Sequence, residues 1–184
     1  MELSFLLWIQ ETLQCGFTDW FFPTVTTLGD KGLIWLTIAA AMLISRKYRK
    51  WGVAMVCALA VTALAGEVIL KHLIQRPRPF TEIAGLELLI PPPSYYSFPS
   101  GHSASSFTAA TVLLLCRKRF GIPALILASL IAFSRMFLFV HYPTDVLAGI
   151  ILGISMGLLI CWLMNKFFPE NRQSKDGKIH VSQM

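Results

Sequence analysis

The hydrophobic residues of the chain fall into long runs, which are separated by short polar turns. One apolar run covers residues 33–45, and the next extends from 51 to about 74. Three more follow at 100–116, 120–140 and 143–168. A helix of about 20 apolar residues spans a bilayer, and basic residues at the ends of such runs are typical of membrane-crossing helices. The pattern therefore predicts an all-α integral membrane protein.

The first 28 residues are largely apolar, but three acidic side chains interrupt the pattern. Such a stretch predicts a helix at the membrane interface followed by a short crossing. Together with the five later runs, it gives a bundle of six transmembrane helices. We expect one membrane domain over residues 1–168 and a polar, disordered, cytoplasmic tail over residues 169–184.

The composition agrees with a membrane protein and argues against several other classes. Only 14% of the 184 residues are charged, and the mean hydropathy of +0.61 is too apolar for an ordinary soluble domain. The net charge of +6 comes mostly from short basic clusters between apolar runs, so we expect no nucleic-acid partner. The cysteines stand singly, without the paired spacing of a zinc site or a disulfide framework: Cys15, Cys57, Cys116 and Cys161.

The distribution of lysine and arginine predicts the orientation in the membrane. Two turns, at residues 46–50 and 117–119, and the C-terminal end together hold eleven of the sixteen basic residues. Because basic loops stay in the cytoplasm, we place these turns and both termini inside. The other five basic residues then lie on the outer face: Lys31, Lys71, Arg76, Arg78 and Arg135.

Three polar segments gather on this outer face, each at a point where an apolar run begins or ends. They cover residues 71–79 (KHLIQRPRP), 99–102 (PSGH) and 134–145 (SRMFLFVHYPTD). Charged groups beside a bilayer are costly, so their presence usually marks a functional site. We therefore expect the three segments to form one site at the membrane–water interface.

The segments supply groups that suit a phosphate. Three cations, Lys71, Arg78 and Arg135, need a multiply charged anion if they converge, and guanidinium groups match phosphate oxygens well. Ser100 and Gly101 stand at the start of a predicted helix, where unpaired backbone N–H groups bind anions. The sequence therefore predicts a phosphate site made of these five residues.

Two histidines in the segments differ in their surroundings. Asp145 lies four residues after His141, so its carboxylate can accept the imidazole N–H and leave the other nitrogen free as a nucleophile. His102 lies beside the anion site and has no obvious carboxylate partner. We predict that His141 attacks phosphorus and forms a phosphohistidine, while His102 protonates the leaving oxygen and later activates water.

At this point the order and spacing of the motifs resemble the three-part signature of the type 2 phosphatidic acid phosphatase superfamily. The first part is Lys71 with Arg78-Pro79, the second is PSGH at 99–102, and the third is Ser134-Arg135 with His141 and Asp145. We find no departure from the pattern, and the six-span plan covers nearly the whole chain.

The resemblance implies phosphate binding by Lys71, Arg78, Ser100, Gly101 and Arg135, with His102 as the acid and His141 as the nucleophile that Asp145 assists. It implies a reaction without a metal or other cofactor, on a lipid phosphate in a bacterial plasma membrane. Undecaprenyl diphosphate is the expected substrate, and phosphatidylglycerophosphate or phosphatidic acid is the alternative. The motifs do not separate a monophosphate from a diphosphate.

Two other functions stay open. A lipid-phosphate carrier could use the same cations without hydrolysis, although binding alone needs no carboxylate-backed histidine. Vanadate-dependent haloperoxidases share the signature, but a short membrane-embedded chain is unlike them.

Several neighbouring residues receive structural interpretations. We expect Glu67 to form an ion pair with Lys71 and expect Arg76 to contact lipid headgroups. Small residues at Gly149, Gly153 and Gly157 predict close packing within the bundle. The proline-rich loop over residues 80–98 is expected to act as a lid or a membrane-dipping segment.

Overall fold

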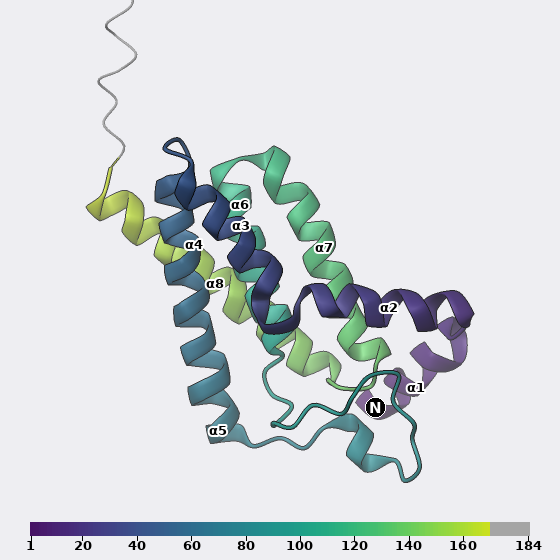
Figure 1. The fold of residues 1–184 in the computed structure, drawn as a ribbon. Coiled ribbons are helices and arrows are strands. Elements are labelled where there is room, and N and C mark those ends of the chain that lie inside the picture. The colour runs from purple at the N-terminus through teal and green to yellow at the C-terminus, as the bar shows by residue number, and fades with distance from the viewer. Residues whose placement is uncertain (170–184) are drawn as a thin grey trace, which may run out of the picture.

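The computed structural model describes residues 1–169, and over that range the chain is helical and has no strand (Figure 1). The main helices are α1 (Glu2–Leu13), α2 (Gly16–Leu28), α3 (Leu33–Ile44), α4 (Arg49–Ala63), α5 (Lys71–Ile74), α6 (Gly101–Cys116), α7 (Lys118–Phe137) and α8 (Pro143–Phe167). Three short elements join them: η1 (Asp30–Gly32), η2 (Leu64–Leu70), which is a π-helical stretch, and η3 (Pro79–Glu82). The predicted polar tail lies, apart from its first residue, outside the described residues.

The helices agree with the apolar runs of the sequence, and the chain is a multi-pass membrane protein. Four segments within residues 1–169 are long and apolar enough to cross a membrane: Gly16–Ile44, Arg49–Glu82, Lys118–Phe137 and Pro143–Phe167. The predicted number of six crossings is not confirmed. The helix α6 has only 16 residues, and α2 and α3 together form one candidate span, within which α2 lies across the long helices in Figure 1.

The helix α6 is the centre of the bundle, and the helices α4, α7 and α8 pack around it. Its buried positions include serines and threonines, whose hydroxyl groups bond inside the bundle. The Thr108 hydroxyl lies 2.9 Å from that of Thr62 on α4, and the Trp35 indole on α3 donates to the Ser106 hydroxyl at 3.0 Å. Residues 106–113 of this helix are all buried, so it can carry hydroxyl groups that a lipid-facing span could not satisfy.

Glycines on α8 allow this helix to lie directly against α6. A Cβ atom at Gly153 would lie 2.4 Å from the Ala104 carbonyl oxygen, and one at Gly149 would lie 2.5 Å from the Ser100 carbonyl oxygen. Both distances are shorter than any ordinary contact. The predicted close packing within the bundle is therefore confirmed, and it places the start of α6 beside the start of α8.

Replacing Gly153 with alanine is expected to destabilise the protein, because the new methyl group must push α8 away from α6. Overpacking of this kind costs about 1–3 kcal/mol, so the midpoint of thermal unfolding in detergent should fall. Gly16→Ala is the matched control, since a Cβ atom there meets nothing within 4 Å. Equal midpoints for Gly153→Ala and the wild-type protein would show that the contact between these helices is looser than described.

At one end of the bundle, the helix α1 and the loop over residues 80–98 cover the turn between α7 and α8 (Figure 1). Leu6 and Ile9 of α1 are buried against this turn, where Phe137 and Phe139 are also fully buried. Partly buried leucine and isoleucine side chains of the loop pack on the same clusters. The N-terminal helix therefore lies next to the third polar segment of the sequence.

Candidate active site

The three polar segments of the sequence meet at one cavity of about 570 Å³. Six of the eight predicted site residues line it: Lys71, Arg78, Gly101, His102, Arg135 and His141. The other two, Ser100 and Asp145, are fully buried behind this lining. The cavity continues away from these residues along α3 and α4, where Leu36, Val56 and Ala60 give it apolar walls.

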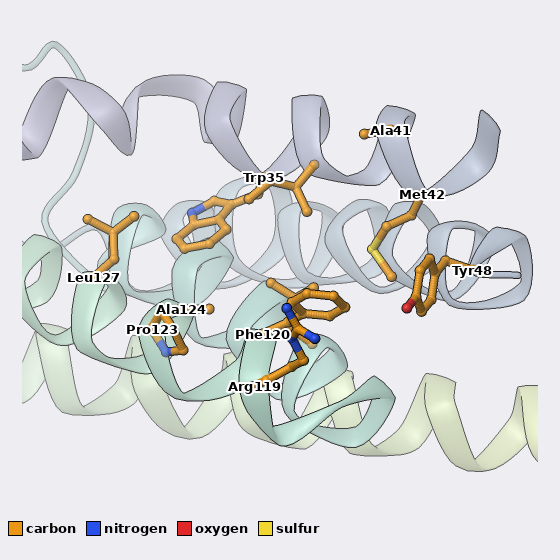
Figure 2. Close-up of a pocket in the computed structure, with 11 residues that line it drawn as sticks. Trp35, Ala41, Met42, Tyr48, Arg119, Phe120, Pro123, Ala124 and Leu127 are labelled. Atoms are coloured by element: carbon orange, nitrogen blue, oxygen red, sulfur yellow. The ribbon is translucent and has the colours of Figure 1, made fainter. Parts of the chain in front are cut away.

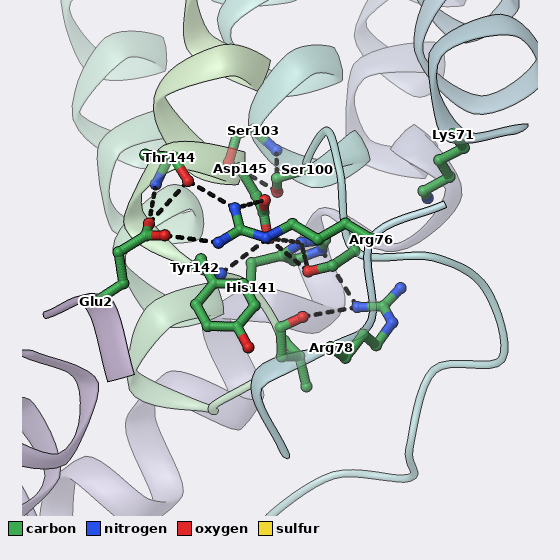
Figure 3. Close-up of polar contacts among 12 residues, drawn as sticks. Glu2, Lys71, Arg76, Arg78, Ser100, Ser103, His141, Tyr142, Thr144 and Asp145 are labelled. Carbon is green, nitrogen blue, oxygen red and sulfur yellow. Dashed lines mark hydrogen bonds and ion pairs between the residues drawn. The ribbon is translucent and has the colours of Figure 1, made fainter. Parts of the chain in front are cut away.

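His141 lies in the turn that connects α7 to α8, and Asp145 follows in the first turn of α8. The imidazole Nδ1 atom lies 3.6 Å from the Asp145 Oδ2 atom, and Figure 3 shows the two side chains together. The Nε2 atom lies 3.4 Å from Nη1 of Arg78, which lines the cavity. This arrangement, which the four-residue spacing predicted, directs Nε2 to the side where an anion would bind.

The Asp145 carboxylate is held by more groups than the sequence suggested. Its Oδ2 atom accepts a hydrogen bond from the Ser97 hydroxyl at 2.5 Å and another from the Tyr142 backbone N–H at 2.9 Å. Its Oδ1 atom lies 2.7 Å from Nη1 of Arg76. The interpretation of Arg76 as a lipid-headgroup contact is therefore wrong, because this guanidinium group bonds to a buried carboxylate.

The surroundings of His141 favour the neutral imidazole. Burial lowers its pKa below the ordinary value, and the positive charges of Arg78 and Arg135 lower it further, while Asp145 opposes the shift. Its protonation therefore requires a pH well below that for a histidine in water. A neutral imidazole with one nitrogen fixed by a carboxylate is the form that can act as a nucleophile.

The three predicted cations reach the cavity from different elements. Lys71 forms a 2.6 Å ion pair with Glu67, as predicted. Arg78 is fixed by two carbonyl oxygens, from Tyr95 at 2.6 Å and from Val140 at 2.8 Å.

Arg135 is almost fully buried, and one of its donors has no bond within the described residues. Its Nη1 atom donates to the Thr26 hydroxyl. Its Nε atom is buried and has no hydrogen-bond partner in residues 1–169. Buried donors are nearly always paired in folded proteins, so a free guanidinium donor beside this cavity suits an anionic ligand.

The start of α6 differs from the sequence prediction in one respect. The Ser100 backbone N–H is not free, because it donates to the Asp145 carbonyl oxygen at 3.0 Å. The Ser100 hydroxyl accepts from the Ser103 hydroxyl at 2.9 Å and caps the helix. Gly101 lines the cavity, and a Cβ atom there would lie only 2.1 Å from a Glu67 carboxylate oxygen. A negatively charged group therefore already lies at this helix N-terminus, where anions are favoured.

His102 has a carboxylate partner, contrary to the sequence prediction. Its Nε2 atom lies 2.8 Å from the Oδ1 atom of Asp30, which is 72 residues earlier in the chain. Asp30 begins η1, where Lys31 and Gly32 adopt positive φ angles of 51° and 67°. This left-handed turn changes the direction of the chain between α2 and α3 (Figure 1) and brings the carboxylate to His102. The turn residues Gly29-Asp30-Lys31-Gly32 were the only local signal for it.

A second cavity, of about 500 Å³, lies between α3 and α7 near the basic turns (Figure 2). Apolar side chains form most of its wall, including Trp35, Met42 and Phe120. None of the predicted site residues lines it. The chemistry suggested by the sequence therefore belongs to the first cavity.

Comparisons with known proteins agree with this placement. The family model of the PAP2 superfamily matches residues 51–169. The chain is 37% identical over 127 residues to an undecaprenyl-diphosphatase of Sulfolobus acidocaldarius, covering 68% of this chain and 61% of that protein. It is 36% identical over 135 residues to a decaprenylphosphoryl-5-phosphoribose phosphatase of Mycobacterium tuberculosis, covering 72% of each chain. The chain thus matches less than two thirds of the Sulfolobus protein's length.

A solved structure has a similar fold over most of the chain. It is the PAP2-type phosphatidylglycerolphosphate phosphatase of Bacillus subtilis, with a TM-score of 0.74 and 27% sequence identity. The similarity covers 90% of this chain and 85% of that one.

Proposed function

The chain belongs to the PAP2 superfamily, and we propose that it is a membrane phosphatase that removes the terminal phosphate from a polyprenyl diphosphate. The expected substrate is undecaprenyl diphosphate, and the products are the polyprenyl monophosphate and inorganic phosphate. The relatives named undecaprenyl-diphosphatase and decaprenylphosphoryl-5-phosphoribose phosphatase, with 37% and 36% identity, support a phosphorylated polyprenyl lipid as the class of substrate.

The shape and charge of the cavity are the observation that carries the proposal. One end contains three cations, Lys71, Arg78 and Arg135, beside the neutral His141. From there the cavity continues along α3 and α4 between apolar side chains such as Leu36 and Val56. A lipid with a charged diphosphate and a hydrocarbon chain fits both parts at once, because each part of the ligand meets a wall of its own kind.

The proposed reaction has two steps. The Nε2 atom of His141 attacks the terminal phosphorus, the bond from phosphorus to the bridging oxygen breaks, and His102 donates a proton to that oxygen. Water then attacks the phosphohistidine, His102 accepts its proton, and the bond from phosphorus to Nε2 breaks. The cations stabilise the charge on the phosphoryl oxygens in both steps. The N-terminus of α6 adds to this when the phosphoryl group takes the place of the Glu67 carboxylate beside Gly101.

The topology is part of the same proposal. We place six crossings in a bacterial plasma membrane, with the cavity at the outer interface and both termini in the cytoplasm. The basic turns at 46–50 and 117–119 support this orientation, because they lie at the other end of the bundle from α5 (Figure 1), whose Lys71 lines the cavity. In this arrangement residues 1–168 form the membrane domain and residues 169–184 a cytoplasmic tail.

Phosphate release from a panel of lipids tests the proposed substrate. Undecaprenyl diphosphate, phosphatidylglycerophosphate and phosphatidic acid would be offered to the purified protein in the same detergent. We expect the largest kcat/KM for the polyprenyl diphosphate. The Bacillus subtilis structure favours phosphatidylglycerophosphate as the second candidate. A larger kcat/KM for phosphatidylglycerophosphate than for the polyprenyl diphosphate would make it the proposed substrate instead. Movement of lipid phosphate across vesicles without any phosphate release would indicate a carrier instead.

The proposed chemistry uses protein side chains alone, so phosphate release is expected to continue in EDTA. Vanadate should inhibit, because it resembles the phosphoryl group in transit. The measurement is the steady-state rate before and after dialysis against the chelator. Loss of activity that added magnesium restores would contradict the mechanism.

A further inference from the structure

Arg76 makes bonds that connect the third polar segment to the N-terminus of the chain. Its Nη1 atom lies 2.7 Å from the Asp145 Oδ1 atom and 2.6 Å from the Thr144 hydroxyl. Its Nη2 atom lies 2.6 Å from the Oε2 atom of Glu2. The guanidinium group also lies 3.9 Å from the centre of the Tyr142 ring. Figure 3 shows Arg76 between the two carboxylates.

Glu2 completes this group from the first turn of α1. Its Oε1 atom accepts hydrogen bonds from the Thr144 hydroxyl at 2.7 Å and from the Thr144 backbone N–H at 3.1 Å. Burial raises the pKa of Glu2, but the bonds from Thr144 and Arg76 outweigh burial and lower the pKa, so the carboxylate is ionised at neutral pH. An anion here also suits the N-terminus of α8.

Arg76 does not line the cavity, although Arg78, two residues later, does. Instead, the Arg76 backbone carbonyl accepts the Ser97 N–H at 2.8 Å, and the Ser97 hydroxyl donates to Asp145. Arg76 and Ser97, whose side chains both bond to Asp145, are therefore also joined to each other by one backbone hydrogen bond. Contact with a phosphate or a headgroup in the cavity does not account for this arrangement.

We propose that Arg76 and Glu2 are positioning residues for the reaction at His141. Arg76 holds the Asp145 carboxylate in the orientation that fixes the imidazole, and Glu2 holds Arg76 and partly balances its charge. The first helix of the chain thereby becomes part of the catalytic assembly. This inference rests on the proposed function, in which His141 is the nucleophile.

The charged groups around His141 determine how easily its imidazole is protonated. The charged groups that face His141 are Asp145 from α8, Arg135 from α7 and Arg78 from the segment after α5. Arg76 adds a positive charge on the far side of Asp145, and this charge repels an imidazolium and so partly offsets the attraction of the carboxylate. Loss of Arg76 should therefore make His141 easier to protonate.

The kinetic test compares Arg76→Ala with Arg46→Ala, an exposed arginine at the other end of the bundle. We expect kcat of Arg76→Ala to fall roughly 10- to 100-fold, by analogy with groups that orient metal-bound histidines. The KM for the lipid should stay within about twofold, because Arg76 does not line the cavity. Methylguanidinium should restore part of kcat, since it can occupy the space left between Asp145 and Glu2. A raised KM with unchanged kcat would indicate a headgroup contact and overturn the proposal.

The pH test compares Arg76→Ala with Glu2→Gln. In Arg76→Ala, the acid limb of the profile of kcat/KM against pH should move to higher pH, because His141 then accepts a proton more readily. In Glu2→Gln it should move slightly to lower pH, because a negative charge is removed. Glu11→Gln, exposed at the other end of α1, should leave the limb in place. Shifts in the same direction, or no shift in either variant, would contradict a role through Asp145.

The titration of His141 by NMR, with nitrogen-labelled histidine and His141→Ala for assignment, gives a readout that does not need turnover. The same opposite shifts are expected for Arg76→Ala and Glu2→Gln in the free protein. If the wild-type protein releases phosphate from no lipid of the panel, the proposed function fails, yet this titration still decides the inference. Identical titration curves in all three proteins would overturn it.

Discussion

Replacing His141 with alanine is expected to abolish phosphate release, lowering kcat by at least about 10⁴-fold. The variant has no atom in place of Nε2 that can form the bond to phosphorus, so the phosphohistidine intermediate cannot form. The cations that hold the substrate remain, and the affinity for the lipid should change far less than the rate. The measurement is phosphate release at saturating polyprenyl diphosphate.

His72→Ala is the matched control for this variant. His72 is exposed on α5, and its imidazole contacts the Val68 carbonyl oxygen at 2.9 Å and is outside the cavity. It should retain wild-type activity. A His141→Ala protein that unfolds at the wild-type temperature and still turns over within tenfold of the wild type would exclude His141 as the nucleophile.

Replacing His102 with alanine is expected to have the second-largest effect, and its size should depend on the leaving group. For a lipid phosphate, loss of a general acid costs about 10²- to 10⁴-fold. For p-nitrophenyl phosphate, whose leaving group needs no proton, the first step should remain fast. The second step should stay slow, because no base activates water. We therefore expect a burst of nitrophenolate equal to the amount of enzyme, followed by slow turnover.

Stopped-flow absorbance of nitrophenolate measures this burst. The wild-type protein provides the reference, and His141→Ala should show no burst. If the rate of the first step fell equally for both substrates in His102→Ala, His102 would bind phosphate or shape the cavity rather than donate a proton.

The sequence predicted the features that depend on short segments. Membership of the family is confirmed, and the four-residue spacing does bring the His141 and Asp145 side chains together at the start of α8. The PSGH segment does start a helix, and Gly101 does face the cavity. These features follow from local rules, because residues a few positions apart at the start of a helix lie close together regardless of the rest of the fold.

The partners of the site residues were missed, because they come from distant parts of the chain. Asp30 lies 72 residues before His102, and Ser97 lies 48 residues before Asp145. Glu2 reaches Arg76 across 74 residues. Such contacts depend on how α1, η1 and the loop over residues 80–98 pack on the bundle. The spacing of hydrophobic residues along the sequence does not predict this packing.

The number of crossings stays a prediction, for a different physical reason. The run at residues 100–116 was predicted as a span, but α6 has only 16 residues, packs mostly against protein and carries buried hydroxyl groups. The first 44 residues contain a helix that lies across the bundle and a left-handed turn, which one hydropathy pattern does not resolve.

Identification of the residue that takes the phosphoryl group tests the account most directly. The His102→Ala protein would be mixed with radiolabelled p-nitrophenyl phosphate, quenched in alkali, which preserves phosphohistidine, and digested. The account predicts about one labelled phosphate per protein, on the peptide that contains His141, and none in His141→Ala. Normal hydrolysis by the wild type without any covalent label in His102→Ala, or a label on another residue, would contradict it.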